Sequence, residues 1–337
     1  MIKVDPKKLH DDAIVIDGTA PITHGGMQYL DWYKEGGCTA VAPTVGSWFD
    51  ASFTIRYLAK FLRHVNARDD LVLVKAAADI ERAKAEDKLG VIFHFQGADA
   101  IEEDLNLITL YKTLGVGIIQ LAYNTKNRIG DGAEEITDCG LSRFGRNFVK
   151  RCNEERVIID CSHTGNRTSL EAAEISERPV IYSHANPKGV YNSRRNISDE
   201  NIKAIAATGG TIGVVGFPGF VSEAPRPSMD QFVAHIDYIA ELVGIDHVAL
   251  GIDYFHGQHP VMSDEAAARE YQQMVAAGHW DPSTYPPPPY YFPEGIETPQ
   301  TLQNLTAALV DRGYSEEDIR KILGLNLMRV YRDVWGA

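Results

Sequence analysis

Two histidines stand at the ends of successive apolar runs in this chain, and their type and spacing suit metal chemistry. His163 closes the run RVIIDCSH, His184 closes the run RPVIYSH, and Asp253 ends a later run, HVALGID. Neutral imidazoles bind zinc well, and a nearby carboxylate can take a proton from a water that the metal polarises. A lone histidine of this kind is more often a hydrogen-bonded structural residue, so the prediction of a metal site depends on all three residues converging.

Other polar side chains also stand at the ends of apolar runs. His94 and Gln96 are two residues apart in GVIFHFQG, so both side chains point to the same face of a strand and join the histidines if that face points inward. Tyr123 ends another run. Arg194 and Arg195 follow in the segment SRRN. Either guanidinium can hold a substrate carboxylate through two hydrogen bonds, or form an ordinary surface ion pair.

Nine short apolar runs must position these residues. The runs are mostly continuous and rich in Val and Ile, as strands covered on both faces are. Residues 53–65 and 229–244, which lie between runs, have the pattern of amphipathic helices. Strict alternation predicts an α/β fold with parallel strands, and so many βαβ units favour one (β/α)8 TIM barrel, residues 1–337, with chemistry at the carboxyl ends of its strands. The runs are residues 13–17, 38–45, 71–77, 90–97, 116–124, 156–163, 178–185, 211–217 and 247–253.

Charge and composition limit the partners of the chain. The 33 Lys and Arg residues against 46 Asp and Glu residues leave a net charge of -13, which argues against nucleic acid or an anionic membrane surface. We therefore predict a small-molecule or peptide substrate. The first fifteen residues lack the apolar stretch of a signal peptide, which predicts a soluble cytoplasmic protein. The four cysteines are scattered and form no CxxC pair, so neither a disulfide framework nor a cysteine zinc site is indicated.

One long stretch, about residues 255–301, departs from the alternation. It contains a helix-like segment, EAAAREYQQMVAA, followed by WDPSTYPPPPYYFPEG, whose prolines cannot join a sheet or a helix. Since it follows the last strand, the stretch is expected over the carboxyl mouth of the barrel as a lid-like insertion. A subunit contact or a surface loop is an equal alternative.

Taken in order, the motifs of this chain resemble the membrane dipeptidase (renal dipeptidase) family of the amidohydrolase superfamily. The resemblance implies a distorted (β/α)8 barrel, two zinc ions bridged by a glutamate, cleavage of dipeptides that have a free carboxylate, and a homodimer. The motifs that carry it are IDG, YNTKNRIGDG with GLSRFGR, IIDCSHTG, PVIYSHA with SRRN, GTIGVV, GIDYFHG and ILGLNLMRV.

The resemblance also implies roles for individual residues. His163 and His184 match the histidines of the second metal, and Arg195 matches the arginine that holds the substrate carboxylate. Asp253 matches the acid of the last strand, and Tyr123 takes a position that contacts substrate. These roles agree with the prediction made from the same residues by type and spacing.

The first-metal motif of the family differs from this sequence. Asp-Gly-His-x-Asp corresponds here to DGTAP, with Thr19 and Pro21 at the ligand positions, and Gln96 stands in place of the bridging glutamate. All three would have held the same cation, and a neutral amide lacks the charge to bridge two divalent ions. We therefore expect one zinc ion rather than two, held by His163 and His184 with the Gln96 carbonyl and a water.

The sequence thus predicts a metal-dependent hydrolase of dipeptides or other small amides that carry a carboxylate. Asp253 is expected to act as base and then acid, and Tyr123 to stabilise the oxyanion. His94 is a candidate replacement ligand beside Gln96. Two alternatives stay open: the same scaffold acting on a non-peptide metabolite, and a catalytically dead protein that binds small carboxylates.

Overall fold

The computed structural model describes residues 4–336 and contains the α/β barrel that the alternation predicts. β1 pairs with β2, pairing continues through β5, β6, β7 and β8, and β9 pairs with β10, all in parallel. The strands are β1 (Ile16–Ala20), β2 (Ala40–Gly46), β3 (Leu71–Leu73), β4 (Leu89–Val91), β5 (Phe93–Phe95), β6 (Val116–Gln120), β7 (Ile158–Asp160), β8 (Val180–Ile181), β9 (Ile212–Val214) and β10 (Val248–Leu250).

The ring closes through two less regular junctions. A parallel bridge between Tyr182 and Ile212 joins the end of β8 to β9, and β10 contacts β1. Gly18 permits this last approach, because a Cβ there would lie 2.9 Å from the carbonyl oxygen of Leu250. β3 pairs with β4 at the edge of the sheet, so the predicted run 71–77 adds a strand outside the closed ring and the barrel is distorted.

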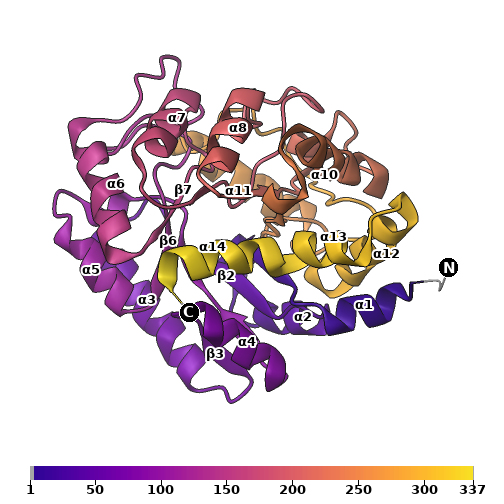
Figure 1. Cartoon of the computed structure of the whole chain (residues 1–337). Helices are drawn as coiled ribbons and strands as arrows, with labels where there is room; N and C mark the ends of the chain where they lie inside the picture. Colours follow the sequence, from indigo (N-terminus) through magenta and orange to yellow (C-terminus); the bar gives the residue numbers. More distant parts are fainter. Residues whose placement is uncertain (1–3, 337) are drawn as a thin grey trace.

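Helices cover the outside of the barrel (Figure 1). The two predicted amphipathic segments form α3 (Ala51–Asn66) and α10 (Met229–Val243), which begin at the side-chain caps Asp50 and Ser228. The other α-helices are α1 (Pro6–Asp12), α2 (Tyr29–Glu35), α4 (Ala77–Ala85), α5 (Asn106–Thr113), α6 (Arg143–Glu155), α7 (Asn166–Ile175), α8 (Asp199–Ala207), α9 (Pro218–Val221), α11 (Asp264–Ala276), α12 (Gln303–Arg312), α13 (Glu316–Arg320) and α14 (Asn326–Trp335).

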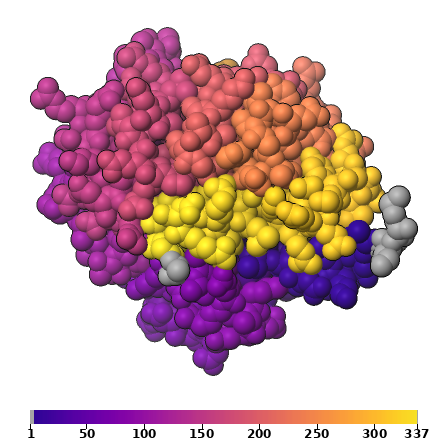
Figure 2. Space-filling view, viewed as in Figure 1, coloured from indigo at the N-terminus to yellow at the C-terminus, as the bar shows by residue number. Residues whose placement is uncertain are grey.

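The C-terminal helices close one end of the barrel. Ser315 caps α13 by accepting from the backbone N–H of Asp318, and one π-helical turn leads into α14. α14 is buried against residues that begin strands, such as Ile16, Ala40 and Ile158. Figure 1 shows this yellow helix crossing the ring, and Figure 2 shows its segment between the indigo start and the magenta middle of the chain. The strand ends that carry the polar residues therefore lie at the opposite mouth.

No helix within residues 4–336 combines the length and the hydrophobicity that crossing a bilayer requires.

Candidate active site

The two histidines predicted as metal ligands lie together at the carboxyl ends of β7 and β8. His163 and His184 are buried, and their ring centroids are 4.8 Å apart. The Nε2 atoms of both rings are buried, and neither has a hydrogen-bond partner among the described residues. Two unpartnered nitrogens side by side in the interior are costly unless a ligand joins them.

The other nitrogen of each ring fixes its tautomer. His163 Nδ1 lies 2.7 Å from Oδ1 of Asn124, whose amide nitrogen donates elsewhere, so Nδ1 carries the proton. His184 Nδ1 lies 2.7 Å from the Ser183 hydroxyl, which itself donates to Asp160, so this Nδ1 is also the donor. Burial lowers the pKa of both imidazoles well below the ordinary value. Each Nε2 therefore presents a lone pair, the state that binds a metal.

Asp160, at the end of β7, organises this side of the mouth. Its carboxylate accepts hydrogen bonds from the backbone and hydroxyl groups of Ser162 and Ser183, at 2.6–2.9 Å, and His94 Nε2 lies 3.1 Å away. Although burial acts to raise the pKa of Asp160, the hydrogen bond and charge of His94 and the neighbouring donors hold it well below its usual value. Asp160 lies in the run RVIIDCSH, and neither its type nor its spacing indicated this role.

The side of the mouth formed by β1 and β5 is arranged differently. His94 and Gln96 do point inward together, as their spacing predicts, but both ring nitrogens of His94 and the amide nitrogen of Gln96 contact neighbouring protein groups. His94 Nδ1 lies 3.4 Å from the Thr19 hydroxyl. The Gln96 amide nitrogen donates to the same hydroxyl at 3.1 Å and to Asp253 Oδ1 at 3.4 Å. Both ring nitrogens of His94 thus lie within hydrogen-bonding distance of protein oxygens.

Two carboxyl groups near this side have raised pKa values. Burial, reinforced by Asp17, raises the pKa of Asp253 to about 8, although Arg195 and Gln96 act in the opposite direction. Burial raises the pKa of Asp17 to about 7, although hydrogen bonds from backbone N–H groups act to lower it.

Asp253, His163 and Asn124 all have positive φ angles, of 65°, 59° and 60°. Such a backbone is uncommon for residues with a side chain and is typical of functional sites.

The structure separates the two arginines that the sequence left as alternatives. Arg194 is exposed and donates to the carbonyl oxygens of Glu134 and Glu135. Arg195 is buried, donates from Nε to the Tyr285 hydroxyl at 3.3 Å, and lies over the ring of Phe220. Its Nη2 is buried and has no hydrogen-bond partner among the described residues. Arg195 is therefore the arginine available to an anion.

Aromatic rings from the stretch 255–301 complete the wall. Tyr123 stacks on His163 with ring centroids 4.1 Å apart, and its hydroxyl accepts from the Trp280 indole at 3.2 Å. Trp280 stacks in turn on Tyr285, and the Tyr285 hydroxyl also exchanges hydrogen bonds with Asn124. Tyr285 and Trp280 received no role from the sequence. The only indication in the sequence was that their segment is rich in aromatic residues. Because that segment has no helix or strand periodicity, the sequence does not show which of its rings reach the barrel mouth.

Several of these side chains line a cavity of about 120 Å³. His163, Gln96 and Asp253 line it, together with rings from the stretch 255–301. Among residues 4–336, no group of three or more His, Cys, Asp or Glu side chains is arranged to hold a metal ion. The two lone pairs of His163 and His184 fit one ion, whose third protein ligand would have to be another kind of group.

A family comparison decides what this arrangement belongs to. The model of the membrane dipeptidase family, peptidase family M19, matches residues 34–278 and 289–336. This chain is a member of the membrane dipeptidase family. The M19 match omits residues 279–288, which contain Trp280 and Tyr285, so this part of the wall is not described by the family pattern.

Individual relatives agree with the M19 assignment. The chain is 30% identical over 241 residues to an uncharacterized dipeptidase of Schizosaccharomyces pombe (strain 972 / ATCC 24843). The matched region covers 70% of this chain but only 51% of that protein. Among solved structures, an amidohydrolase from Pseudomonas aeruginosa has a TM-score of 0.88 and 34% identity, covering 99% of this chain and 100% of that one. A metallo peptidase from Rhodobacter sphaeroides has a TM-score of 0.79 and 21% identity, with 96% and 100% covered, and shares the fold. The chain thus spans about half the length of the first curated relative that it matches.

Proposed function

We propose that this M19 protein hydrolyses dipeptides or other small amides that carry a free carboxylate, with one zinc ion at its barrel mouth. The observation that carries the proposal is the pair of buried, unpartnered Nε2 atoms of His163 and His184, each with its tautomer fixed from behind. A protein that did not bind a ligand there would leave two lone pairs unsatisfied in its interior.

His163 and His184 would hold the ion, and the amide oxygen of Gln96 is the candidate third ligand. When bound, zinc supplies a Lewis acid that makes water nucleophilic near neutral pH. We propose one ion because both ring nitrogens of His94, the Thr19 hydroxyl and the Gln96 amide nitrogen already contact one another, Asp160 or Asp253.

Arg195 binds the substrate carboxylate in this proposal. Its Nη2 has no partner to give up, and its guanidinium is held by Tyr285 and by the face of Phe220. An ion pair with a buried guanidinium, formed through directed hydrogen bonds, orients a small substrate well.

Asp253 and Tyr123 handle the proton and the developing charge. In its ionised form, which dominates only above its pKa of about 8, the Asp253 carboxylate takes a proton from the attacking water and returns it to the leaving amine nitrogen. The Tyr123 hydroxyl accepts from Trp280, which leaves its own hydrogen to donate to the carbonyl oxygen as negative charge develops there. The Rhodobacter sphaeroides metallo peptidase is liganded with a phosphinate mimic of the dipeptide L-Ala-D-Ala, which supports a substrate of this size.

The proposal is tested by counting metal and measuring turnover in the same preparations. Plasma mass spectrometry on protein purified without added metal or chelator gives zinc per chain for wild type and for the His163→Ala, His184→Ala double variant. Release of the C-terminal amino acid from a dipeptide panel gives turnover. About one zinc in wild type, absent from the double variant together with activity, is expected. Folded wild-type protein that binds no metal and hydrolyses nothing would favour a protein that only binds carboxylates.

A further inference from the structure

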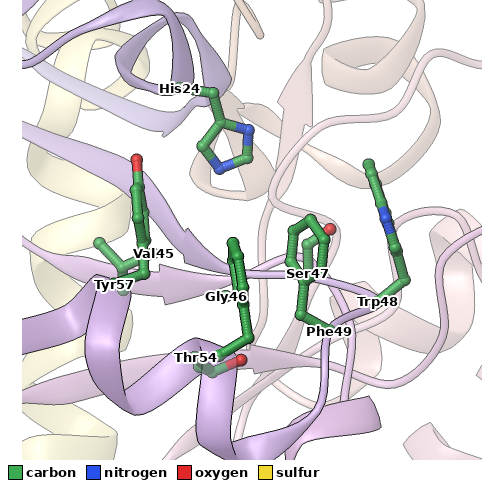
Figure 3. A pocket seen from close by; sticks show the side chains of 9 residues that line it. His24, Val45, Gly46, Ser47, Trp48, Phe49, Thr54 and Tyr57 are labelled. Atoms are coloured by element: carbon green, nitrogen blue, oxygen red, sulfur yellow. The ribbon is translucent and has the colours of Figure 1, made fainter.

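A second cavity adjoins the candidate active site. It has a volume of about 230 Å³ and is formed where the chain leaves β2 and enters α3 (Figure 3). His24 and Trp48 line both this cavity and the catalytic one, so the two spaces are neighbours across these side chains. The side chains that line it are His24, Val45, Gly46, Ser47, Trp48, Phe49, Phe53, Thr54 and Tyr57.

The second cavity has an aromatic, uncharged wall. Phe49 and Phe53 have ring centroids 4.1 Å apart, and the edge of His24 meets Tyr57 at 5.8 Å. No carboxylate, lysine or arginine lines it. Phe53 is 42% exposed although it stands in this apolar group. Covering exposed apolar surface of this kind with another apolar group is favourable, because it removes that surface from water.

Two of the residues that line the cavity carry buried hydroxyl groups. Ser47 and Thr54 line it and are each about 1% exposed. Their Oγ and Oγ1 atoms have no hydrogen-bond partner among the described residues.

Arg195, which is proposed to bind the substrate carboxylate, and the second cavity lie next to different parts of the candidate active-site cavity. Arg195 contacts Phe220 and Tyr285, which line the catalytic cavity but not the second one. The second cavity is reached past Trp48 and His24 instead. A substrate whose carboxylate lies on Arg195 therefore directs its other end, the acyl side of the scissile amide, toward the aromatic wall.

We propose that this aromatic cavity binds a ring-bearing apolar group on the acyl side of the substrate. The inference rests on the proposed hydrolase function, because that function sets which end of the substrate carries the carboxylate. In dipeptide terms, the N-terminal residue has a large apolar side chain. Covering a phenyl group in such a cavity is worth about a 10- to 100-fold gain in kcat/KM.

The test compares Ala-Gly with Phe-Gly, which differ only by a phenyl group on the acyl side. Glycine release by zinc-loaded full-length protein gives kcat/KM, and calorimetry of the same protein gives affinity if no glycine is released. Phe53→Ala removes part of the aromatic wall. Ile55→Ala is the matched control, since Ile55 is on the same helix, is 37% exposed and does not line the cavity.

We expect wild type and Ile55→Ala to prefer Phe-Gly by at least tenfold, and Phe53→Ala to reduce that preference to within about threefold. Turnover of both dipeptides with equal efficiency would overturn the aromatic subsite and leave the hydrolase function standing. Tighter binding of Phe-Gly without turnover, lost in Phe53→Ala, would support the subsite and overturn the hydrolase function. Neither turnover nor a difference in binding would overturn both.

Discussion

The two sides of the barrel mouth hold the same kinds of residue in opposite states. At the ends of β7 and β8, His163 and His184 are fixed through Nδ1, and their Nε2 atoms have no partner in the described part of the chain. At the ends of β1 and β5, the ring nitrogens of His94, the amide nitrogen of Gln96 and the hydroxyl of Thr19 contact protein partners. We infer that the first side is built for a ligand, and that the second side, apart from the amide oxygen of Gln96, holds the fold together.

The largest effect is expected from His184→Ala on the first side. Removing one of two histidine ligands should abolish stoichiometric zinc and lower kcat/KM for dipeptides by about 1,000-fold or more, because the Lewis acid is lost. Zinc analysis and steady-state kinetics check this. Full activity without zinc would show that the unpartnered nitrogens serve another purpose, and the contrast between the sides would fail.

His94→Ala is the matched substitution on the second side. It removes the imidazole from the buried Asp160 carboxylate, so the free energy of unfolding should fall by about 3–4 kcal/mol, while zinc per chain stays at the wild-type value. Urea unfolding and metal analysis measure the two quantities. Loss of zinc with unchanged stability would make His94 a metal ligand instead.

Asp17, on the second side, should make the free energy of unfolding depend on pH, and its raised pKa fixes the direction of that dependence. Its folded-state pKa of about 7 lies above the ordinary 3.8, so the folded chain keeps a proton that the unfolded chain releases. The resulting stability is complete below about pH 4 and is lost as pH rises through 7.

Asp17→Asn should remove that loss. Relative to wild type, the variant should gain about 2–3 kcal/mol in unfolding free energy between pH 5 and pH 8. Chemical unfolding at the two pH values gives the difference. Parallel pH curves for variant and wild type would mean that Asp17 is ionised in the folded protein.

The smallest effect is expected where Tyr285, from the stretch 255–301, contacts Arg195 on the first side. Tyr285→Phe removes the acceptor for Arg195 Nε, which should cost about 1 kcal/mol, or about a fivefold rise in KM with kcat little changed. Tyr290→Phe is the control, because its hydroxyl donates within the insertion to Pro286. An equal rise in KM in both variants would assign the effect to the loop as a whole.

The local sequence determined the fold to a large extent. Runs such as CTAVAPTV and VGIIQLAYN contain strands because continuous apolar residues are stable only when covered on both faces. The positions of His163, His184 and Asp253 at strand ends followed from the same runs. The apolar pattern therefore indicated which end of the barrel carries polar groups.

Only the tertiary structure decided which polar atoms have partners. His94 pairs in register with Ile118, and Gln120 with Asp160, and this stagger brings His94 to a carboxylate 66 positions away. Trp280 and Tyr285 reach the site from a proline-rich loop. A loop has no periodicity from which its contacts can be predicted, and hydrogen-bond partners depend on angles and distances of a few ångströms that residue types do not encode. The sequence thus determined where the polar residues gather, and the packing of the chain decided which of them remain available to a ligand.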